Sequence, residues 1–366
     1  MGSWNRFTLV VMEQGQTGLS ASGRKLRIAQ VASLWAKIPP VTYGGIELVI
    51  KLLIDELVAQ GHEVTLFGTG DSQTAAQLRA VTPENVLAAM ESGAAASYEY
   101  YANASVTDAL LAAGEFDLIH FHIGNQFVPM SLLTKTPSVH TLHTFLIQDD
   151  EWILNRYPQV PVAAISKYQV HSIPREIPVI YNGCDFDAYQ PRFEAGKYLV
   201  FLGRMSYDKN PLDAILVAKK LGMPIVLAGK AQSAKEEKYF QENIVPLIDN
   251  ESVKFIGLVN HEQKNELLRN ASALLFPVQW EEPFGLVMIE AMACGTPVVG
   301  YNRGSVPEVV DPGITGYYTD SIERLEQLTL EALKLDRTMV VQKARERFSY
   351  QRMVADYLAL YQGLSK

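Results

Sequence analysis

The stretch from Leu275 to Gly300, LFPVQWEEPFGLVMIEAMACGTPVVG, constrains the fold of this chain more than any other segment. The apolar run 273–278 is short and ends in a polar turn that contains proline, which predicts a buried strand. The run 284–294 is longer and rich in alanine, methionine and leucine, which predicts a helix, and Pro297 begins the next strand. A strand, a turn, a buried helix and a second strand are typical of a parallel α/β sheet.

The turn before this helix is suited to an anion. Pro283 stands at the helix entrance, where proline does least harm, and Gly285 lacks the side chain that would keep a ligand off the backbone. The first N–H groups of a helix are unpaired and carry about half a positive charge, so they bind phosphate readily. We therefore expect the backbone at Gly285, Leu286 and Val287 to contact a phosphate group.

Two carboxylates flank this predicted anion site. Glu282 precedes the helix and Glu290 lies about two turns inside it, which separates them by on the order of 10 Å along the axis at ~1.5 Å per residue. Each carboxylate can accept hydrogen bonds from hydroxyl groups. A nucleoside diphosphate sugar fits this layout, with ribose at one carboxylate and hexose at the other. The alternative is an amphipathic helix with two surface glutamates.

The same stretch resembles the E-x7-E signature of the family 4 retaining glycosyltransferases. The matching positions are Glu282, Phe284, Gly285, Glu290, Ala291, Gly295, Pro297 and Val298. The segment RGSVPEVVDPGITGYY, from Arg303, resembles a second family segment, except that Ser305 replaces a glycine and Pro312 precedes Gly313. The resemblance covers the chain after Lys25 and implies the GT-B architecture, in which two Rossmann-like α/β domains with parallel sheets face each other across a cleft.

Length and composition agree with two domains. The chain has 366 residues, 48% of them hydrophobic, which is enough for two sizeable cores. A net charge of −8 argues against a general nucleic-acid binder. Cys184 and Cys294 have neither metal-ligand nor redox-motif spacing, and no apolar run approaches the ~18 residues of a spanning helix. We therefore expect a reduced, cytoplasmic protein with at most peripheral membrane association.

The order of elements defines the predicted domains, because short aliphatic runs alternate with helical stretches from Leu26 onward. Strands are expected at 26–32, 62–67, 116–122, 138–143, 161–166, 177–181, 197–202, 224–228, 253–258 and 273–278. Helices are expected at 46–61, 211–221, 235–248 and 262–271, and the alanine-rich region 75–113 is expected to be helical. We divide the chain into a tail or vector-derived extension (1–24), an N-terminal acceptor domain (25–184), a C-terminal donor domain (185–345) and a final helix (346–366). The family resemblance implies that this last helix crosses back to the N-terminal domain.

Gly44 and Gly45 lie between the first predicted strand and the first predicted helix. Phosphate binds at this position in many nucleotide folds, but the G-x-G-x-x-G spacing of a dinucleotide site is missing. An ordinary tight turn therefore explains the pair equally well. The family resemblance favours a phosphate role, because it implies that the glycine pair faces the diphosphate across the cleft.

Four histidines lie in or after two predicted strands: His120, His122, His140 and His143. Imidazole is a common zinc ligand, but this spacing on extended backbone gives no fixed ligand pair. Carboxyl ends of strands face the ligand crevice of an open α/β sheet, so His122 and His143 are candidates for substrate contact. The resemblance implies that His143, in Thr141-Leu142-His143, lies beside the donor sugar. Core histidines hydrogen-bonded to backbone are the alternative.

The loop after the strand 197–202 carries Gly203, Arg204 and Lys209. Arg204 can hold a phosphate in a bidentate manner and Lys209 as a point charge. These residues match a G-R-x-x-x-x-K motif of the family, and Leu258 lies in a segment similar to the one whose backbone contacts the nucleotide base. Asp185-Phe186-Asp187 matches the short D-x-D metal motif, but it follows a predicted linker turn. We therefore expect no metal site.

These features predict transfer of a hexosyl unit, with retention of configuration, from a nucleoside diphosphate sugar to a hydroxyl group. The expected donor is a UDP-sugar such as UDP-glucose, and the expected acceptor is a glycan, a glycolipid or other lipid-linked acceptor, or a small molecule. No cofactor, metal or nucleic acid is expected. The predicted catalytic residues are Glu282, His143, Arg204 and Lys209, with the two cations stabilising the departing diphosphate.

Three other classes use related architectures. A GT-B epimerase or hydrolase would consume donor without an acceptor, and a catalytically silent subunit would typically lose one of the carboxylates. A nicotinamide-dependent oxidoreductase is disfavoured because the G-x-G-x-x-G motif is missing.

Overall fold

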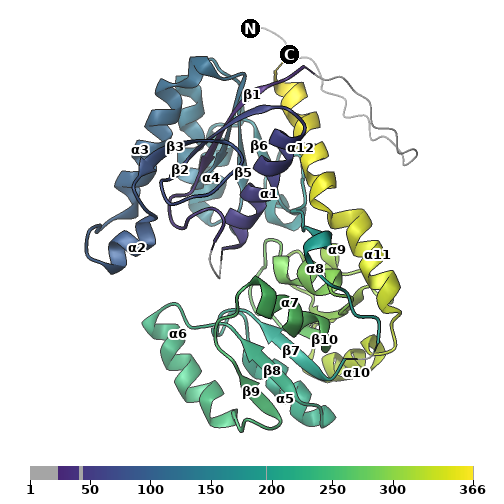
Figure 1. Ribbon diagram of the computed structural model, residues 1–366. Helices are drawn as coiled ribbons and strands as arrows, with labels where there is room; N and C mark the ends of the chain where they lie inside the picture. Colours follow the sequence, from purple (N-terminus) through teal and green to yellow (C-terminus); the bar gives the residue numbers. More distant parts are fainter. Residues whose placement is uncertain (1–23, 41–43, 195, 366) are drawn as a thin grey trace.

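The structure is a computed structural model that describes residues 24–40, 44–194 and 196–365. Its strands form two six-stranded, fully parallel sheets, with strand orders β3-β2-β1-β4-β5-β6 and β12-β11-β10-β7-β8-β9. The first sheet lies in the upper half of Figure 1 and the second in the lower half. The predicted α/β class with two parallel sheets is confirmed. The predicted tail, 1–24, lies outside the described residues apart from Arg24.

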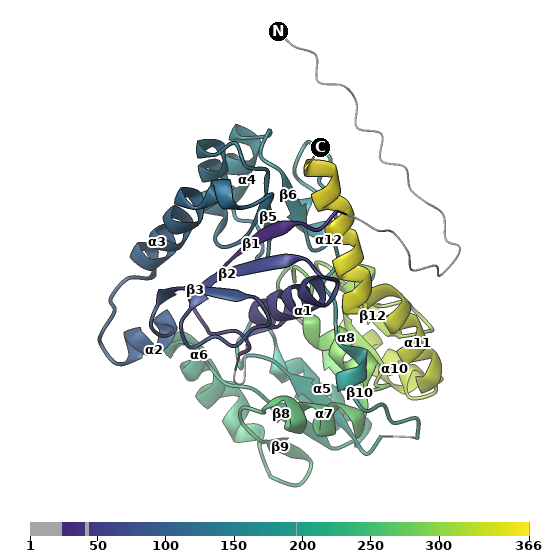
Figure 2. The same ribbon diagram turned by 45° about the horizontal axis from the view of Figure 1, so that its top comes forward.

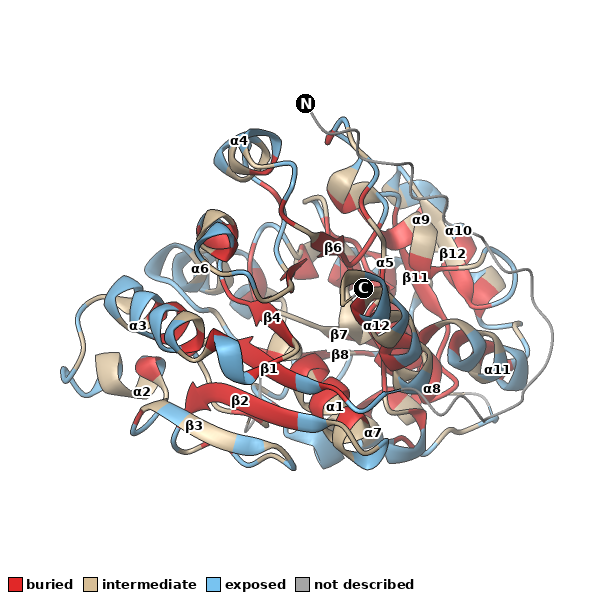
Figure 3. Ribbon diagram, turned by 90° about the horizontal axis from the view of Figure 1, so that it is seen from above, coloured by how far each residue is buried: buried red, intermediate tan, exposed pale blue. Residues whose placement is uncertain are grey.

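The first sheet is formed by the N-terminal half of the chain. Its strands are β1 (Arg27–Ala32), β2 (Glu63–Thr69), β3 (Gln77–Thr82), β4 (Leu118–His122), β5 (Ser138–Leu142) and β6 (Val162–Ala164). The accompanying helices are α1 (Gly45–Ala59), α2 (Val86–Glu91), α3 (Tyr98–Leu111) and α4 (Gln148–Arg156). Figure 3 shows β1, β2 and β4 buried over most of their length, with an exposed face of α3 turned outward. Helices therefore cover this sheet, as a parallel sheet requires.

Two predictions for this half are wrong. The region 75–113 is not helical throughout, because it begins with the edge strand β3, which pairs with β2. The expected strand 177–181 is reduced to one bridge between Ala164 and Val179. Pro178 lies inside that segment, and because proline has no N–H it cannot donate to a strand ladder.

The second sheet is formed by the C-terminal half. Its strands are β7 (Tyr198–Leu202), β8 (Ile225–Ala228), β9 (Val253–Phe255), β10 (Ala271–Phe276), β11 (Val298–Tyr301) and β12 (Gly316–Thr319). The helices are α5 (Pro211–Leu221), α6 (Ala234–Tyr239), α7 (His261–Arg269), α8 (Leu286–Ala293), α9 (Val306–Val309), α10 (Ile322–Ala332), α11 (Arg337–Phe348) and α12 (Tyr350–Leu364). The helix expected at 235–248 changes to π-helical geometry after Tyr239 and to a 3₁₀ turn at Pro246, which cannot donate an α-helical hydrogen bond.

The last two helices connect the two halves of the molecule. Phe348, at the end of α11, is buried in the core of the second sheet, whereas Tyr357 and Tyr361 of α12 are buried in the core of the first. The crossing occurs at Ser349, which forms a bridge with Cys184 where the chain first passes between the halves. Figures 1 and 2 show α12 lying beside α1 on the first sheet.

Within the described ranges, no helix combines the length and the apolar character needed to span a bilayer.

Candidate active site

The helix predicted at 284–294 begins at Leu286, two residues later than expected. Gly285 is its N-cap and has φ +77°, in the left-handed region that favours glycine; a Cβ there would lie 2.7 Å from Cε of Met288. No side chain of the described residues caps this end, and Gly285, Leu286 and Val287 are partly exposed. The N-terminus of α8 is therefore open to an anion, as predicted from its composition. Glu282 precedes this helix, as predicted, but Glu290 lies about one turn inside it rather than two, because the helix begins later than expected.

Leu286 brings the two halves of the molecule together at this point. Its side chain packs against the cores of both sheets, and its Cδ1 lies only 2.7 Å from where a Cβ on Gly45 would stand. Gly45 is the first residue of α1, and Gly44 is its N-cap. The N-termini of α1 and α8 therefore meet between the two halves, and a side chain at position 45 would collide with Leu286.

Glu282 is held firmly in the loop before α8. Its side chain is 8% exposed, and Oε2 forms an ion pair with Nζ of Lys209 and accepts a 2.9 Å hydrogen bond from Nε1 of Trp280. The ammonium of Lys209 also lies over the Trp280 ring, 4.8 Å from its centroid. In the described part of the chain Oε1 has no hydrogen-bond partner, so this oxygen can accept a hydrogen bond from a ligand hydroxyl.

The turn after β11 fixes this loop from behind. The carbonyl of Glu282 accepts a 2.8 Å hydrogen bond from the N–H of Ser305, and the Ser305 hydroxyl donates to the carbonyl of Phe284 at 2.9 Å. Gly304, with φ +55°, donates its N–H to Oε2 of Glu281 at 2.6 Å. Ser305, which departs from the family glycine, therefore adds a bond that a glycine could not make.

Glu290 has an equivalent arrangement one turn inside α8. Its Oε1 accepts a 3.0 Å hydrogen bond from the hydroxyl of Tyr189 and pairs with Nζ of Lys264, while Oε2 has no partner among the residues described. In each of the two predicted carboxylates, one oxygen is therefore bound by two donors. Phe284, also predicted to contact the donor, is buried against Phe348, so we expect it to fix the turn rather than contact ligand.

The two predicted cations are held by different carboxylates. Arg204 pairs through Nη1 with Glu236 of α6, and its side chain is 22% exposed, whereas Lys209 pairs with Glu282. Gly203 precedes Arg204, and its backbone lies close to Gly229, which follows β8. A Cβ on Gly229 would lie 1.8 Å from the carbonyl oxygen of Gly203. Leu258 follows β9 and is 41% exposed.

The predicted histidines form a buried side-chain network. Nε2 of His143 lies 2.8 Å from Nδ1 of His122, and Nε2 of His122 lies 2.7 Å from Oε1 of Gln30. Burial lowers the pKa of His143 to about 4 and lowers the pKa of His122 well below its usual range, so both rings are neutral at pH 7. His140 instead bonds to the Ser131 hydroxyl at 2.7 Å and stacks on Phe121, which makes it a core residue.

The D-x-D residues have structural partners. Asp185 accepts the N–H of Asp187 at 3.1 Å, and the carboxylate of Asp187 pairs with Arg345 at 2.8 Å. Across the described ranges, no group of three or more His, Cys, Asp or Glu side chains is arranged to hold a metal ion. Asp185 therefore caps a short 3₁₀ turn, and Asp187 ties this turn to α11.

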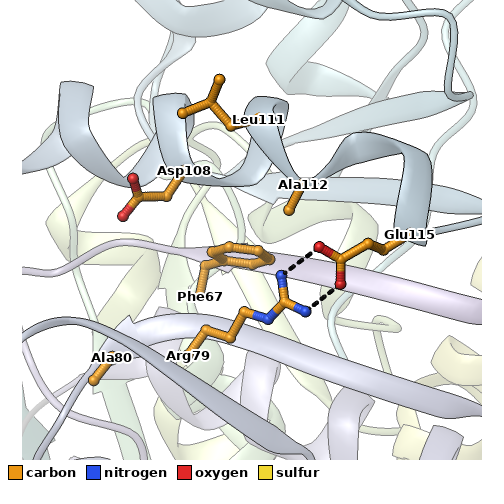
Figure 4. A pocket seen from close by; sticks show the side chains of 7 residues that line it. All are labelled: Phe67, Arg79, Ala80, Asp108, Leu111, Ala112 and Glu115. Carbon is orange, nitrogen blue, oxygen red and sulfur yellow. Dashed lines mark hydrogen bonds and ion pairs between the residues drawn. The ribbon is translucent and has the colours of Figure 1, made fainter.

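Two surface hollows lie apart from these residues. A surface hollow of about 380 Å³ is lined by residues of α3, β2 and β3, and Figure 4 shows Arg79 reaching across it to Glu115. Arg79 bonds to Glu115 at 3.2 Å and lies over Phe67, so its charge is already neutralised inside the hollow. The other, of about 450 Å³, lies beside α7 near Tyr198. Neither is lined by a predicted site residue.

Several residues that build the site were missed in the sequence. Trp280, Tyr189, Lys264, Glu236 and Gln30 each hold a predicted site residue in place. Trp280 had a local signal, because it lies two positions before Glu282 within the E-x7-E stretch. The others come from distant segments, for which a single sequence offers no signal.

Comparison with known proteins agrees with this architecture. Residues 43–188 match the family model Glycosyltransferase Family 4, and residues 186–352 match the model Glycosyl transferases group 1. Spore coat protein SA of Bacillus subtilis (strain 168) is 24% identical over an alignment 391 positions long, which covers 92% of this chain and 99% of that protein.

Solved structures share the fold. The crystal structure of AviGT4, a glycosyltransferase involved in avilamycin A biosynthesis, is 26% identical with a TM-score of 0.72 and covers 93% of this chain and 98% of its own. Anabaena Alr3699/HepE in complex with UDP-glucose is 19% identical, with a TM-score of 0.68, and covers 92% of this chain and all of its own. This chain belongs to family 4 of the glycosyltransferases, a retaining hexosyltransferase family with the GT-B fold.

Proposed function

We propose that this chain transfers a hexosyl unit from a UDP-sugar, such as UDP-glucose, to a hydroxyl group of a glycan, a lipid-linked acceptor or a small molecule, without a metal ion. The observation that carries the proposal is the pair of carboxylates around the open N-terminus of α8. Glu282 and Glu290 each keep one oxygen bound by two donors and the other without a partner among the described residues. The UDP and UDP-glucose complexes of Alr3699/HepE support the choice of donor.

In this proposal the donor lies between the N-termini of α1 and α8. The diphosphate binds the N–H groups at Gly285, Leu286 and Val287, because helix N-termini stabilise anions. Gly45, at the start of α1, leaves room for the phosphates from the other side, since a side chain at this position would already touch Leu286. The ribose binds Glu290, the hexose binds Glu282, and the backbone near Leu258 lies by the base.

Arg204 and Lys209 keep donors for the diphosphate although each is paired. An ammonium has three N–H donors and a guanidinium has five. Lys209 can therefore hold Glu282 and a phosphate oxygen together, and Glu236 is within hydrogen-bonding distance of only one nitrogen of Arg204, Nη1. As the glycosidic bond breaks, negative charge accumulates on the diphosphate, and fixed cations stabilise that charge. This assigns stabilisation of the leaving group to the protein itself.

We also propose that the N-terminal domain, 25–184, binds the acceptor and that the C-terminal domain, 185–345, binds the donor, in a cytoplasmic protein. Both free cysteines are buried, and burial raises the pKa of each thiol. Such thiols are protonated and unreactive at neutral pH. This chemistry is compatible with a reducing compartment.

Ligand-induced thermal shift with a panel of nucleotide sugars tests the donor assignment without an acceptor. A ligand present at 100 times its dissociation constant stabilises the folded protein by about 2.7 kcal/mol. We expect a UDP-sugar to raise the melting temperature of the wild type and of Lys220→Ala, a surface lysine on α5, and to raise that of Lys209→Ala less. If no nucleotide sugar shifts the wild type, or if both lysine variants respond equally, the donor site is not the one proposed.

A further inference from the structure

A continuous hydrogen-bonded network joins the last helix of the chain to His143, the residue that follows β5. Tyr361 of α12 contacts Gln30 of β1 at 3.3 Å, Gln30 contacts His122 of β4 at 2.7 Å, and His122 contacts His143 at 2.8 Å. Gln30 and Tyr361 are completely buried and His122 is 3% exposed. A buried network of this kind is shielded from water, so its donors and acceptors must match one another.

The direction of these hydrogen bonds follows from the amide of Gln30. Its Nε2 donates to the Tyr361 hydroxyl, so Oε1 is the atom that faces Nε2 of His122. A carbonyl oxygen only accepts, and therefore His122 carries its proton on Nε2. In a neutral His122 ring Nδ1 is then an acceptor, and it must receive the proton of Nε2 of His143.

The hydrogen bonds beyond Tyr361, which lead to His120 and Thr141, are compatible with this assignment of donors and acceptors. The Tyr361 hydroxyl accepts from Gln30 and can donate to Nδ1 of His120 at 2.6 Å. His120 can then donate from Nε2 to the hydroxyl of Thr141 at 2.7 Å, and Thr141 is also bonded to the Tyr357 hydroxyl at 2.8 Å. Tyr357 therefore belongs to a side branch that does not pass through Gln30.

We propose that Tyr361, acting through Gln30 and His122, fixes the tautomer of His143 so that this ring presents an unprotonated Nδ1 to the sugar in the cleft. Nδ1 of His143 has no hydrogen-bond partner in the part of the chain that the structure describes. In this tautomer it accepts a hydrogen bond from a sugar hydroxyl, whereas the opposite tautomer would donate one. Tyr361 is thus a positioning residue, and the contact to sugar rests on the function proposed above.

Tyr361→Phe removes the acceptor that orients the Gln30 amide. The amide can then rotate, and both directions of the His122–His143 bond become accessible. Tyr357→Phe is the matched control, because it removes the hydroxyl of an equally buried tyrosine on the same helix but leaves the Tyr361, Gln30, His122 and His143 contacts in place. Gln30→Met tests the same step from β1 and replaces Tyr361→Phe if that variant does not fold.

Nitrogen NMR of the full chain labelled with ¹⁵N-histidine distinguishes a protonated from an unprotonated ring nitrogen. At pH 7, with the His143 signal assigned by its loss in His143→Ala, we expect wild type and Tyr357→Phe to show a single tautomer protonated on Nε2. Tyr361→Phe or Gln30→Met should show a mixture of tautomers. A wild-type ring protonated on Nδ1, an unchanged Tyr361→Phe, or an equal change in Tyr357→Phe would overturn the inference.

Kinetics then separate this inference from the proposed function. With a donor that the wild type turns over, Tyr361→Phe should lower kcat/KM by about tenfold, the effect of one neutral hydrogen bond, and Tyr357→Phe should not. If the two variants lose equal activity, Tyr361 has only a structural role and the inference fails. If the wild type turns over no nucleotide sugar, the proposed function fails while the NMR result still decides the tautomer.

Discussion

The guanidinium of Arg204 forms an ion pair with the carboxylate of Glu236, a residue in the first turn of α6. The Glu236 side chain is 13% exposed, and its Oε2, which is not the oxygen paired with Arg204, accepts a 2.6 Å hydrogen bond from the N–H of Gln232. Arg204 is therefore preorganised at the carboxyl end of β7 before any donor binds. Groups that are fixed in advance stabilise developing charge best, because little reorganisation remains to be made during the reaction.

Arg204→Ala should lower kcat by about a hundred to a thousandfold, which corresponds to roughly 3 to 4 kcal/mol, by analogy with the loss of one oxyanion donor. Arg204→Lys should retain only part of the wild-type kcat, because the lysine ammonium keeps the positive charge but not the planar guanidinium that binds phosphate through two N–H groups. Steady-state kinetics at saturating donor measure both variants. Glu236→Gln is the control, since it leaves Arg204 in place and should reduce kcat far less. Near-normal kcat in both Arg204 variants would make this residue a loop-stabilising cation instead.

Removing Glu290 should weaken donor binding rather than slow the chemical step, because a ribose contact is nearly the same in the ground state and the transition state. The loss of a hydrogen bond to a charged group predicts an increase in donor KM of about ten- to a hundredfold in Glu290→Ala. Tyr189→Phe removes one of the two donors to Oε1 but keeps the carboxylate, so its KM should rise less. A normal KM with a collapsed kcat in Glu290→Ala would contradict the ribose assignment.

Activity should persist in EDTA, because Arg204, Lys209 and the N-terminus of α8 are assigned the role of neutralising the diphosphate. The assay compares wild type before and after chelation, with Asp187→Asn as a companion. This variant should lose only the Arg345 pair, and its activity should stay close to that of wild type. Loss of activity in EDTA with recovery on Mn²⁺ would instead show that the reaction requires a metal.

The buried histidines should make the fold sensitive to acid. Burial lowers the pKa of His140 to about 3 and that of His143 to about 4, whereas an unfolded chain binds these protons near pH 6.5. Between pH 6.5 and about 4 the unfolded state therefore holds more protons, so the free energy of unfolding falls as pH falls. The loss from pH 7.5 to 5.5 is about 1.4 kcal/mol for each of these two rings.

His120 and His122 add to this effect, because burial also lowers their pKa values well below the usual range. Urea unfolding at a series of pH values measures the combined effect. An unfolding free energy that stayed constant from pH 7.5 to 5.5 would show that these rings are not neutral in the folded protein.

The sequence was sufficient to predict those parts of the fold and of the site that depend on residues adjacent in the chain. The strand, turn and helix around Gly285 follow from local chemistry, and so does the placement of Glu282 beside an open helix end. The strand β3 was missed because it is a short edge strand in an alanine-rich region, and its ladder depends on pairing with β2.

Most of the residues that hold the site side chains in position could not be predicted, because they lie far from the site in the sequence. The hydroxyl of Tyr189 reaches Glu290 across 101 positions of sequence, and Tyr361 reaches Gln30 across 331. Such contacts depend on how two sheets and a crossing helix pack, and no local pattern in the sequence encodes them. The local pattern therefore identified candidate ligand contacts, while tertiary packing determined what holds them in position.

The stereochemistry of the first sugar product shows whether this protein cleaves a nucleotide sugar with retention of configuration. Family membership and the site together predict cleavage of an α-linked nucleotide sugar with retention, so slow transfer to water should first release the α-anomer of the hexose. Proton NMR, recorded before the anomers equilibrate, distinguishes the two anomers. We expect an initial excess of α-anomer together with stoichiometric nucleoside diphosphate, both strongly reduced in Arg204→Ala. Initial release of the β-anomer, or equal cleavage by Arg204→Ala, would contradict it.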